Sequence, residues 1–560
     1  MEESRTTGQG RGLAAGWQSL ISFLATGALF ALSFPPFDLP EAAYVFAVPL
    51  LLYGLFGRPA KREGLQLLAA GWLSWLVLIV WLRNCTLALD MPLAGAFGWF
   101  ITLALALILA AFWSAWCLAA LKAARLARTQ PVISRLFMML GMAGLWVVLE
   151  WLRGWLFTGF PWLPLSTSQW QRPLLLQIAS LTGGYGISFV LVCFNFGLSF
   201  YIFTLWHNRK ASWLKRLSPE FYLALAVLLA SISFGLQTGG TTQRGRIEGP
   251  RLAFIQPDID IDQKWDSERV GQTLDILEDL STYAEYLGAD LVLWPESPTP
   301  LPVKGSPSMQ RWVENLSRKL QLPILMGNVA REELEDSDGH QWYNAVFVVG
   351  PDSGVDLDSY YAKRHLVPFG EYVPLAGWLP FIRKFVPIEG DFGHGLSPRV
   401  LDLSGVVENG GQVGNLICYE DIFPSLARAN VRSGADWHYV ATNNAWFGEE
   451  GGAWQHAAHS VLRAVETRRP VVRCGNAGWS GWIDEFGHIR HNLLDKQGSI
   501  YFQGVDTARF TRNAWWAGRL SPYVRYGDWF VWTSAGLVMV AALLVRWYSR
   551  RHRAAAATGP

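Results

Sequence analysis

Charged residues are scarce in this chain, and its cysteines follow no pattern. Charged residues make up 16% of the 560 positions and hydrophobic residues 51%, whereas soluble globular proteins average about 25% charged residues. The formal net charge is only +2, so no basic face dominates and nucleic acid is not predicted as a partner. The five cysteines show no regular or CxxC spacing, which argues against a disulfide framework and a thiolate metal site. The sequence predicts no metal and no cofactor.

The few charges are distributed unevenly along the chain. Apolar runs follow one another over residues 17–237, and one more extends over 529–545. Residues 251–512, in contrast, have the composition of an ordinary soluble domain. This difference predicts a membrane protein that carries one large water-exposed domain.

A helix needs about 20 apolar residues to cross a bilayer, and eight runs approach that length. They cover residues 14–34, 42–57, 65–83, 94–121, 136–157, 177–205, 221–237 and 527–546. Arginine and lysine precede the first run and follow the second, fourth, sixth and eighth. Since basic loops stay in the cytoplasm, we expect both chain ends there. The domain between the seventh and eighth spans then faces the periplasm, with the chain in the bacterial inner membrane.

The predicted domain boundaries follow from this pattern. They are a bundle of seven spans over 1–238, a linker over 239–250, the outer domain over 251–512, the eighth span over 527–546 and a cytoplasmic tail over 547–560.

The outer domain alternates short apolar strands with helical stretches. Strands are predicted at residues 252–256, 291–294, 324–326, 345–349, 413–417, 439–442, 471–473 and 501–503. The polar stretch 269–287 has apolar residues at helical spacing. Such alternation predicts a layered α/β domain with buried strands.

One cysteine lies where a strand meets a helix. In "ICYEDIFP" the strand ends at Ile417, Cys418 follows at once, and Pro424 suits the first turn of a helix. A free cysteine is most often a small buried hydrophobe. At this corner, however, the helix N-terminus is expected to favour the thiolate, which is a strong nucleophile toward carbonyl carbons.

Two further motifs could supply a base and a cation. Glu296, in "LVLWPESP", follows a strand at its carboxyl end, where open α/β sheets gather their sites. "YYAKRHLVPFGEYVP" contains Lys363 and Glu371, and a lysine can stabilise an oxyanion. Taken singly, a glutamate such as Glu296 is usually a solvated loop acid, and the second motif would be a charged loop.

In the order Glu, Lys, Cys, the motifs "WPES", "YAKRHLVPFGE" and "ICYEDIFP" resemble those of the carbon–nitrogen hydrolase (nitrilase) superfamily. "TNNAWFG" and "RCGNAGWSG" resemble the strands that follow the cysteine there. With eight flanking spans, the chain resembles more narrowly the membrane-embedded apolipoprotein N-acyltransferase family over nearly its whole length. The resemblance implies a nitrilase-like α-β-β-α sandwich domain, inserted between the seventh and eighth of eight transmembrane helices.

The resemblance also implies a two-step acyl transfer with a Glu-Lys-Cys triad. Cys418 would attack the sn-1 ester of phosphatidylethanolamine and form a thioester, from which the acyl chain passes to the α-amine of a diacylglyceryl apolipoprotein. Glu296 would be the base, and Lys363 with the backbone N–H of Tyr419 would stabilise the oxyanion. The implied partners are this phospholipid donor, the apolipoprotein acceptor and the membrane; nothing in the sequence requires more than a monomer.

Supporting roles are implied for four other residues. Glu371 would orient the lysine or assist the base, Tyr419 and Glu420 would shape the pocket, and Trp265 would lie at its mouth. The segment 374–387, rich in aromatic residues, is either a lid that dips into lipid or a core-packed connection.

Several other polar or reactive residues are assigned no catalytic role. His456 and His459 have helical spacing but no evident third metal ligand, so a polar helix face explains them better. Cys474 is expected to be buried and inert. The acidic stretch 331–340 is expected to be a solvated loop. Glu150 and Arg153, near the end of the fifth span, are candidates for an internal ion pair.

Two alternatives remain open from the residues alone. The first is a membrane-tethered amidase, in which water and not an amine resolves the thioester. The second is a transporter or scaffold whose outer domain only binds lipopeptide. The fate of the acyl group separates the first from acyl transfer, and a cysteine variant separates the second.

Overall fold

The computed structural model describes residues 2–87, 93–239, 245–260, 268–334, 339–374, 376–378, 383 and 391–557. The chain divides into two compact units. We call residues 1–80, 99–237 and 528–560 the helical unit, and residues 81–98 and 238–527 the sandwich unit.

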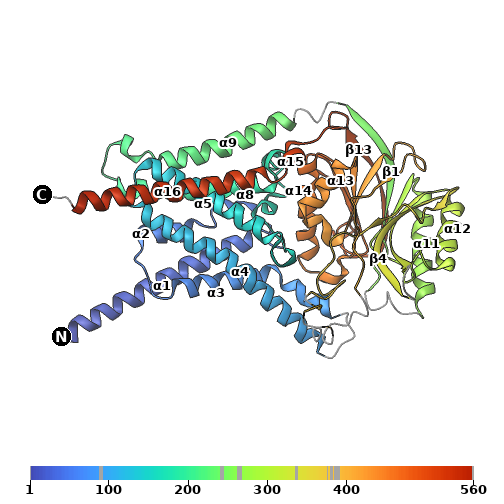
Figure 1. Cartoon of the computed structure of the whole chain (residues 1–560), viewed down its shortest axis with the longest axis horizontal. Coiled ribbons are helices and arrows are strands. Elements are labelled where there is room, and N and C mark those ends of the chain that lie inside the picture. The colour runs from blue at the N-terminus through green and yellow to red at the C-terminus, as the bar shows by residue number, and fades with distance from the viewer. Residues whose placement is uncertain are drawn as a thin grey trace. The chain divides into compact units, whose positions relative to one another are not determined.

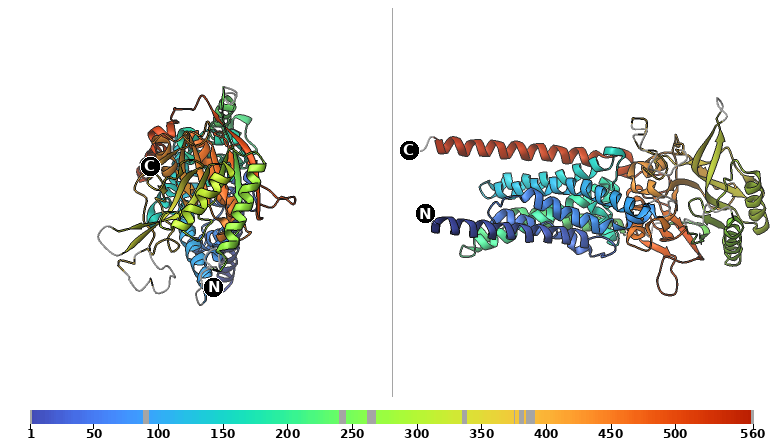
Figure 2. Two further views of the ribbon diagram at one scale, coloured as in Figure 1. Left: turned by 90° about the vertical axis from the view of Figure 1, so that its right-hand side faces the viewer. Right: turned by 90° about the horizontal axis from the view of Figure 1, so that it is seen from below.

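The helical unit is a bundle of helices (Figure 1). Its main helices, some of which extend beyond the unit, are α1 (Glu2–Leu32), α2 (Val48–Phe56), α3 (Glu63–Leu78), α4 (Ala94–Ala127), α5 (Val132–Arg153), α8 (Gly184–His207), α9 (Pro219–Gly239) and α16 (Trp529–Ala557). α1 packs against α3, and α16 lies along α5. The chain ends of α1 and α16 lie at the same end of the bundle (Figure 2).

Among the residues that the structure describes, five helices are long and apolar enough to cross a membrane, so the chain has the character of a multi-pass membrane protein. They are α4, α5, α8, α9 and residues Trp529–Arg551 of α16. A sixth candidate is α3 with the short helix η2 (Val80–Thr86), bent by 57° at their junction. The first two predicted spans coincide with shorter apolar helices, Gly16–Leu32 and Pro40–Phe56. The count of eight spans stays a prediction.

The sandwich unit contains two mixed sheets. The first has the order β13-β1-β2-β3-β4-β5, with β6 paired to β4, and the second has the order β12-β11-β10-β9-β8-β7. Strands β1, β2 and β3 are parallel, as are β8, β9 and β10. The first sheet comprises β1 (Arg246–Gln256), β2 (Leu291–Trp294), β3 (Ile324–Glu333), β4 (His340–Gly350), β5 (Gly354–Val355), β6 (Tyr361–Ala362) and β13 (Gly504–Asn513). The second comprises β7 (Val400–Asp402), β8 (Gln412–Ile417), β9 (Trp437–Thr442), β10 (Val471–Gly475), β11 (Gly481–Ile483) and β12 (Ile489–Asn492).

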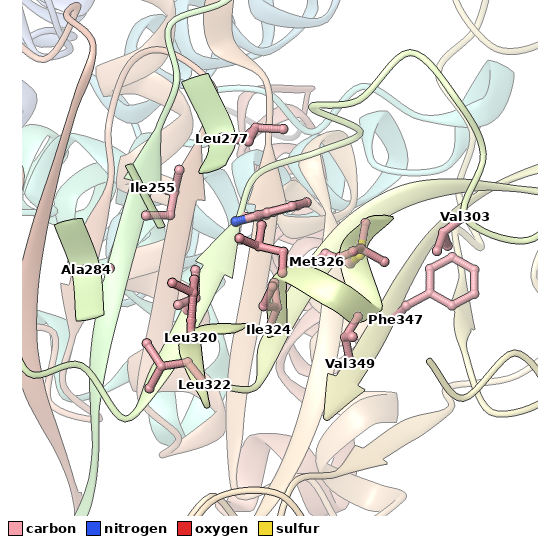
Figure 3. Close-up of a cluster of buried hydrophobic side chains, with 14 of the residues drawn as sticks. Ile255, Leu277, Ala284, Val303, Leu320, Leu322, Ile324, Met326, Phe347 and Val349 are labelled. Carbon is pink, nitrogen blue, oxygen red and sulfur yellow. The ribbon is translucent and has the colours of Figure 1, made fainter. Parts of the chain in front are cut away.

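The two sheets and the helices that cover them form four layers. Side chains such as Phe254 and Leu293 of the first sheet meet Ile417 and Tyr439 of the second in a buried core. The other face of the first sheet packs on α11 (Val270–Tyr286) and α12 (Pro307–Leu320), where Leu277, Leu320 and Ile324 are buried together (Figure 3). Helices α13 (Pro424–Arg432) and α14 (Gly452–Thr467) pack on the second sheet. The nitrilase-like α-β-β-α arrangement is therefore present.

Seven of the eight predicted strands coincide with observed ones, as does the helix predicted over 269–287. The strand predicted over 501–503 is wrong, because those residues only precede β13. β13 is half exposed along most of its length, so it lacks an apolar run.

Parts of the predicted linker and of the predicted acidic loop are β-strands. β1 begins at Arg246, inside the predicted linker, where it pairs with the end of β13. Arg331–Glu333 pair with His340–Trp342 in the hairpin of β3 and β4, so the acidic stretch is not a simple loop. In both cases main-chain pairing with a neighbouring strand forms a strand without an apolar pattern.

Candidate active site

The three proposed catalytic residues follow strands that end at one edge of the sandwich. Glu296 comes two residues after β2, Lys363 directly after β6, and Cys418 directly after β8. A hydrogen bond from the Glu296 backbone N–H to the carbonyl of Thr442, at the end of β9, joins the two sheets there (3.4 Å). The topology thus gathers motifs that are far apart in the sequence, as expected at the carboxyl ends of parallel strands.

Lys363 is held between two carboxylates. Its Nζ lies 2.9 Å from Glu371 Oε1 and 3.3 Å from Glu296 Oε1. Asn344 Nδ2 donates to the same two oxygens, at 2.8 Å to Glu296 and 2.9 Å to Glu371. Burial lowers the pKa of Lys363, but the charges of Glu371 and Glu296 outweigh it and raise the pKa above its usual value. The lysine is therefore a permanent cation at neutral pH.

Cys418 is a protonated thiol at neutral pH. Burial, followed by the charge of Glu296, raises its pKa to about 12, although Lys363, the Thr442 side chain and the Asn443 backbone oppose this shift. The direction of this shift is opposite to the expectation that a helix N-terminus favours the thiolate. The predicted helix is present as α13 but begins only at Pro424, and the helix at Cys418 itself, η8 (Cys418–Ile422), is a single short turn, so the dipole effect at the thiol is weak compared with burial beside a carboxylate. The thiol needs a base at the moment of attack.

Glu420 links the loop that contains Lys363 to β8, the strand that precedes Cys418. Its Oε1 accepts from the backbone N–H groups of Arg364 (2.7 Å) and His365 (3.1 Å). Its Oε2 accepts from the Tyr361 hydroxyl (2.7 Å) and the Ile417 backbone N–H (2.8 Å). The side chain is fully buried. It therefore holds the two motifs at a fixed distance, and its part in shaping a pocket stays a prediction.

The other supporting residues lie in different settings. Tyr419 is half-buried, with its ring against His365 and Phe423. Glu371 also accepts from the Val367 backbone N–H (2.8 Å). This hydrogen bond lies within the loop that follows Lys363. Trp265 lies outside the described residues. So does most of the segment 374–387, although Trp378 is described and is 88% exposed.

Two features of the site were not predicted. Asn344 bridges both carboxylates, and its signal was a polar residue inside the apolar strand β4. His456, expected on a polar helix face, is buried, as is His459, because α14 is covered along nearly its whole circumference. Nε2 of His456 lies 3.0 Å from the carbonyl oxygen of Cys418. The burial predicted for Cys474 is confirmed.

Glu150 and Arg153 belong to the helical unit. Glu150 Oε1 accepts from the Trp146 indole and the Leu165 backbone N–H, both at 2.6 Å. The Arg153 guanidinium lies 5.1 Å from the centre of the Trp75 ring. Both side chains line a cavity of about 30 Å³, which has room for roughly one water molecule. Among the described residues, Glu150 Oε2 and Arg153 Nε are buried without a hydrogen-bond partner, and the predicted ion pair between the two side chains stays a prediction.

Two family models match the chain. One describes the apolipoprotein N-acyltransferase N-terminal domain and covers residues 26–197, and the other describes carbon-nitrogen hydrolases and covers residues 251–517. Similar curated proteins include the apolipoprotein N-acyltransferase of Geobacter metallireducens, which is 33% identical over 94% of this chain and 95% of its own. The Pseudomonas aeruginosa (strain PAO1) protein of the same name is 30% identical over 95% and 96%. Among solved structures, a mutant of a Nesterenkonia amidase from the nitrilase superfamily matches with a TM-score of 0.36 and 18% identity, over 51% of this chain and 96% of its own.

Proposed function

This chain belongs to the apolipoprotein N-acyltransferase family, and we propose that it transfers an acyl chain from a phospholipid to the α-amine of an apolipoprotein. The donor is the sn-1 ester of phosphatidylethanolamine, and the acceptor amine belongs to a cysteine that carries an S-diacylglyceryl group. The observation that carries the proposal is the meeting of Glu296, Lys363 and the Cys418 thiol at one edge of the sandwich.

In the first step the Cys418 sulfur attacks the ester carbonyl carbon while Glu296 takes the thiol proton. Lys363 and the backbone N–H of Tyr419 stabilise the tetrahedral oxyanion. When this intermediate collapses, the C–O bond to the lysophospholipid breaks, and the leaving oxygen takes the proton from Glu296. A thioester on Cys418 remains.

In the second step the acceptor amine attacks the thioester carbonyl and passes its proton through Glu296. Collapse breaks the C–S bond, and the Cys418 sulfur leaves and regains a proton. The net reaction exchanges an ester and an amine for an amide and an alcohol, and it needs no further reactant. Splitting the transfer makes sense because thioesters react with amines far more readily than unactivated esters do.

The location follows from the substrates. We propose that residues 251–512 form a periplasmic catalytic domain on eight inner-membrane spans and that the protein acts as a monomer. Both substrates carry acyl chains, so they reach the enzyme by lateral diffusion in the bilayer. The five helices in the described part of the chain that are able to cross a membrane support such an anchored arrangement.

The proposal is tested with the purified full-length protein in liposomes of phosphatidylethanolamine with an isotope-labelled sn-1 chain, together with a synthetic S-diacylglyceryl peptide. We expect the labelled chain on the peptide α-amine, with one lysophospholipid released for each peptide. Cys418→Ala should give no product. Cys474→Ala, which removes a thiol buried between the sheets, is the matched control and should remain active.

Three results would contradict this proposal. Release of free fatty acid without N-acylated peptide would indicate that water resolves the thioester, as in an amidase. N-acylated peptide from the Cys418→Ala variant would show that Cys418 is not the nucleophile, and a wild-type protein that binds the lipopeptide but forms no product would indicate a binding protein.

A further inference from the structure

A buried histidine holds the main chain of the proposed nucleophile. Cys418 has a φ of +49°, a left-handed conformation that residues with a side chain rarely adopt. Nε2 of His456, on α14, lies 3.0 Å from the Cys418 carbonyl oxygen, and the side chain is 1% exposed. This contact therefore stabilises a main-chain conformation at Cys418 that would be unfavourable without it.

The neighbours of His456 determine which ring nitrogen carries the proton. Nδ1 faces two donors, Asn444 Nδ2 at 3.1 Å and Arg473 Nη2 at 3.2 Å. Nε2 faces two acceptors, the Cys418 carbonyl at 3.0 Å and Asp421 Oδ1 at 3.1 Å. Only the neutral tautomer with hydrogen on Nε2 fits both sides. Burial lowers the pKa of His456 more than Asp421 raises it, in agreement with a neutral ring.

The surroundings hold the ring rigidly. Asp421 accepts from Arg473 and from the Ser460 hydroxyl, and all three side chains are fully buried. The ring of Phe447 lies edge-on, with its centre 6.0 Å from that of His456. The carboxylate and the guanidinium that contact the ring balance each other. This buried network holds the His456 ring in one orientation. Its net charge is close to zero, so it is poorly suited to drive proton transfer.

The carbonyl of Cys418 and the N–H of Tyr419 belong to the same peptide unit. Among the described residues the only cis peptide bond is Pro35–Pro36, so this unit is trans and its two groups point in opposite directions. A donor that fixes the carbonyl therefore fixes the direction of the N–H. We propose that His456 is a positioning residue, which aims the Tyr419 N–H at the oxyanion. This inference rests on the proposed function, where that N–H is an oxyanion donor.

Three variants at this position test the proposal in the full-length protein. In His456→Gln the amide nitrogen reaches the place of Nε2 and can still donate, whereas in His456→Asn it reaches only the place of Nδ1. We expect the glutamine variant to keep kcat within about tenfold. The asparagine and alanine variants should lose about 10²-fold, the size of a lost oxyanion donor. KM for the lipopeptide should change less than about threefold, because the oxyanion donor acts only on the transition state.

Alkylation separates oxyanion positioning from a general structural role. Iodoacetamide reacts by displacement at a saturated carbon, which develops no oxyanion. We expect the rate of Cys418 alkylation, followed by peptide mass spectrometry, to be unchanged in all three variants. His438, a buried histidine on β9 near Thr467, provides the control. His438→Ala should lower stability but leave kcat per folded molecule intact.

Three results would overturn the proposal: an unchanged kcat in His456→Asn, a loss in His456→Gln as large as in His456→Asn, or a parallel loss of kcat and Cys418 alkylation. If His456→Ala does not fold, the comparison of glutamine with asparagine still decides. Acylation of Cys418 by a p-nitrophenyl ester gives a readout without lipid or lipopeptide. A wild-type protein that reacts with this ester but acylates no peptide would refute the proposed function and leave this inference testable.

Discussion

Two buried charge networks flank the proposed nucleophile, one on each sheet, and they differ in composition. On the first sheet, Lys363 lies between Glu296 and Glu371, so two carboxylates share one ammonium group. On the second sheet, Asp421 pairs with Arg473 beside the neutral His456. The carboxylates of the first network are 10% and 12% exposed, whereas the Asp421–Arg473 pair is completely enclosed.

This difference indicates a division of labour. The first network has an excess of negative charge and can take up a proton, as a base must. The second is balanced and closed, so its charges can only stabilise one another and the main chain around Cys418. We therefore expect changes in the first network to affect chemistry and changes in the second to affect stability and geometry.

The largest effect is expected from Glu296→Gln. Loss of the base should lower acyl transfer by about 10³-fold. The same change removes the charge that raises the pKa of Cys418, so alkylation of that thiol by iodoacetamide at pH 8 should become faster. Product formation and peptide mass spectrometry measure the two rates. An unchanged rate of acyl transfer in Glu296→Gln would contradict the assignment of Glu296 as the base.

Asp421→Asn should act mainly on stability. It leaves the Arg473 guanidinium buried without its carboxylate, which typically costs about 3–5 kcal/mol. Chemical denaturation of the sandwich unit, followed by tryptophan fluorescence, measures the loss. Asp436→Asn is the control, because Asp436 pairs with Arg512 at a partly exposed position, 3.0 Å away, where a pair contributes about 1 kcal/mol or less. Equal losses in the two variants would remove the distinction between the networks.

Glu371→Gln should lower acyl transfer by about tenfold to a hundredfold, the contribution of a hydrogen bond to a charged group. Glu371 raises the pKa of Lys363, and the lysine must be protonated to stabilise an oxyanion. Without this carboxylate the pKa of Lys363 falls, so the alkaline decline in activity should begin at a lower pH than in the wild type. A pH–rate profile measures this shift, and an unchanged alkaline limb would contradict the assignment of Lys363.

The last prediction concerns the wild-type thiol alone and involves no loss of activity. Since the pKa of Cys418 is raised to about 12, its alkylation should increase about tenfold per pH unit from pH 8 to 11. Glutathione in the same buffer, whose thiol ionises near the ordinary value, should reach its plateau earlier. A plateau of Cys418 alkylation at or below pH 9 would instead show the thiolate that the sequence pattern alone predicts.

The predictions from sequence succeeded where a local pattern determines structure. The strands before Glu296 and Cys418 are short apolar runs that end in polar motifs, so the runs located both strands and the motifs marked their ends. β13 has no such run, because its strand conformation comes from pairing with β1.

The features that the sequence could not provide depend on tertiary contacts. Asn344 reaches both carboxylates only after β4 pairs with its neighbours. His456 meets the Cys418 carbonyl across a helix-to-sheet interface, so helical spacing alone suggested an exposed face. The protonation of Cys418 depends on burial and on Glu296, which lies 122 positions earlier in the chain. Local motifs therefore identify candidate chemistry, and the fold determines its charge state.

The most direct test is intact-protein mass spectrometry of the purified enzyme after incubation with phosphatidylethanolamine and without lipopeptide. We expect one added acyl mass on Cys418, removed by hydroxylamine, consumed on addition of lipopeptide and absent from Cys418→Ala. N-acylated peptide formed by an enzyme that never carries such an adduct would contradict the covalent mechanism.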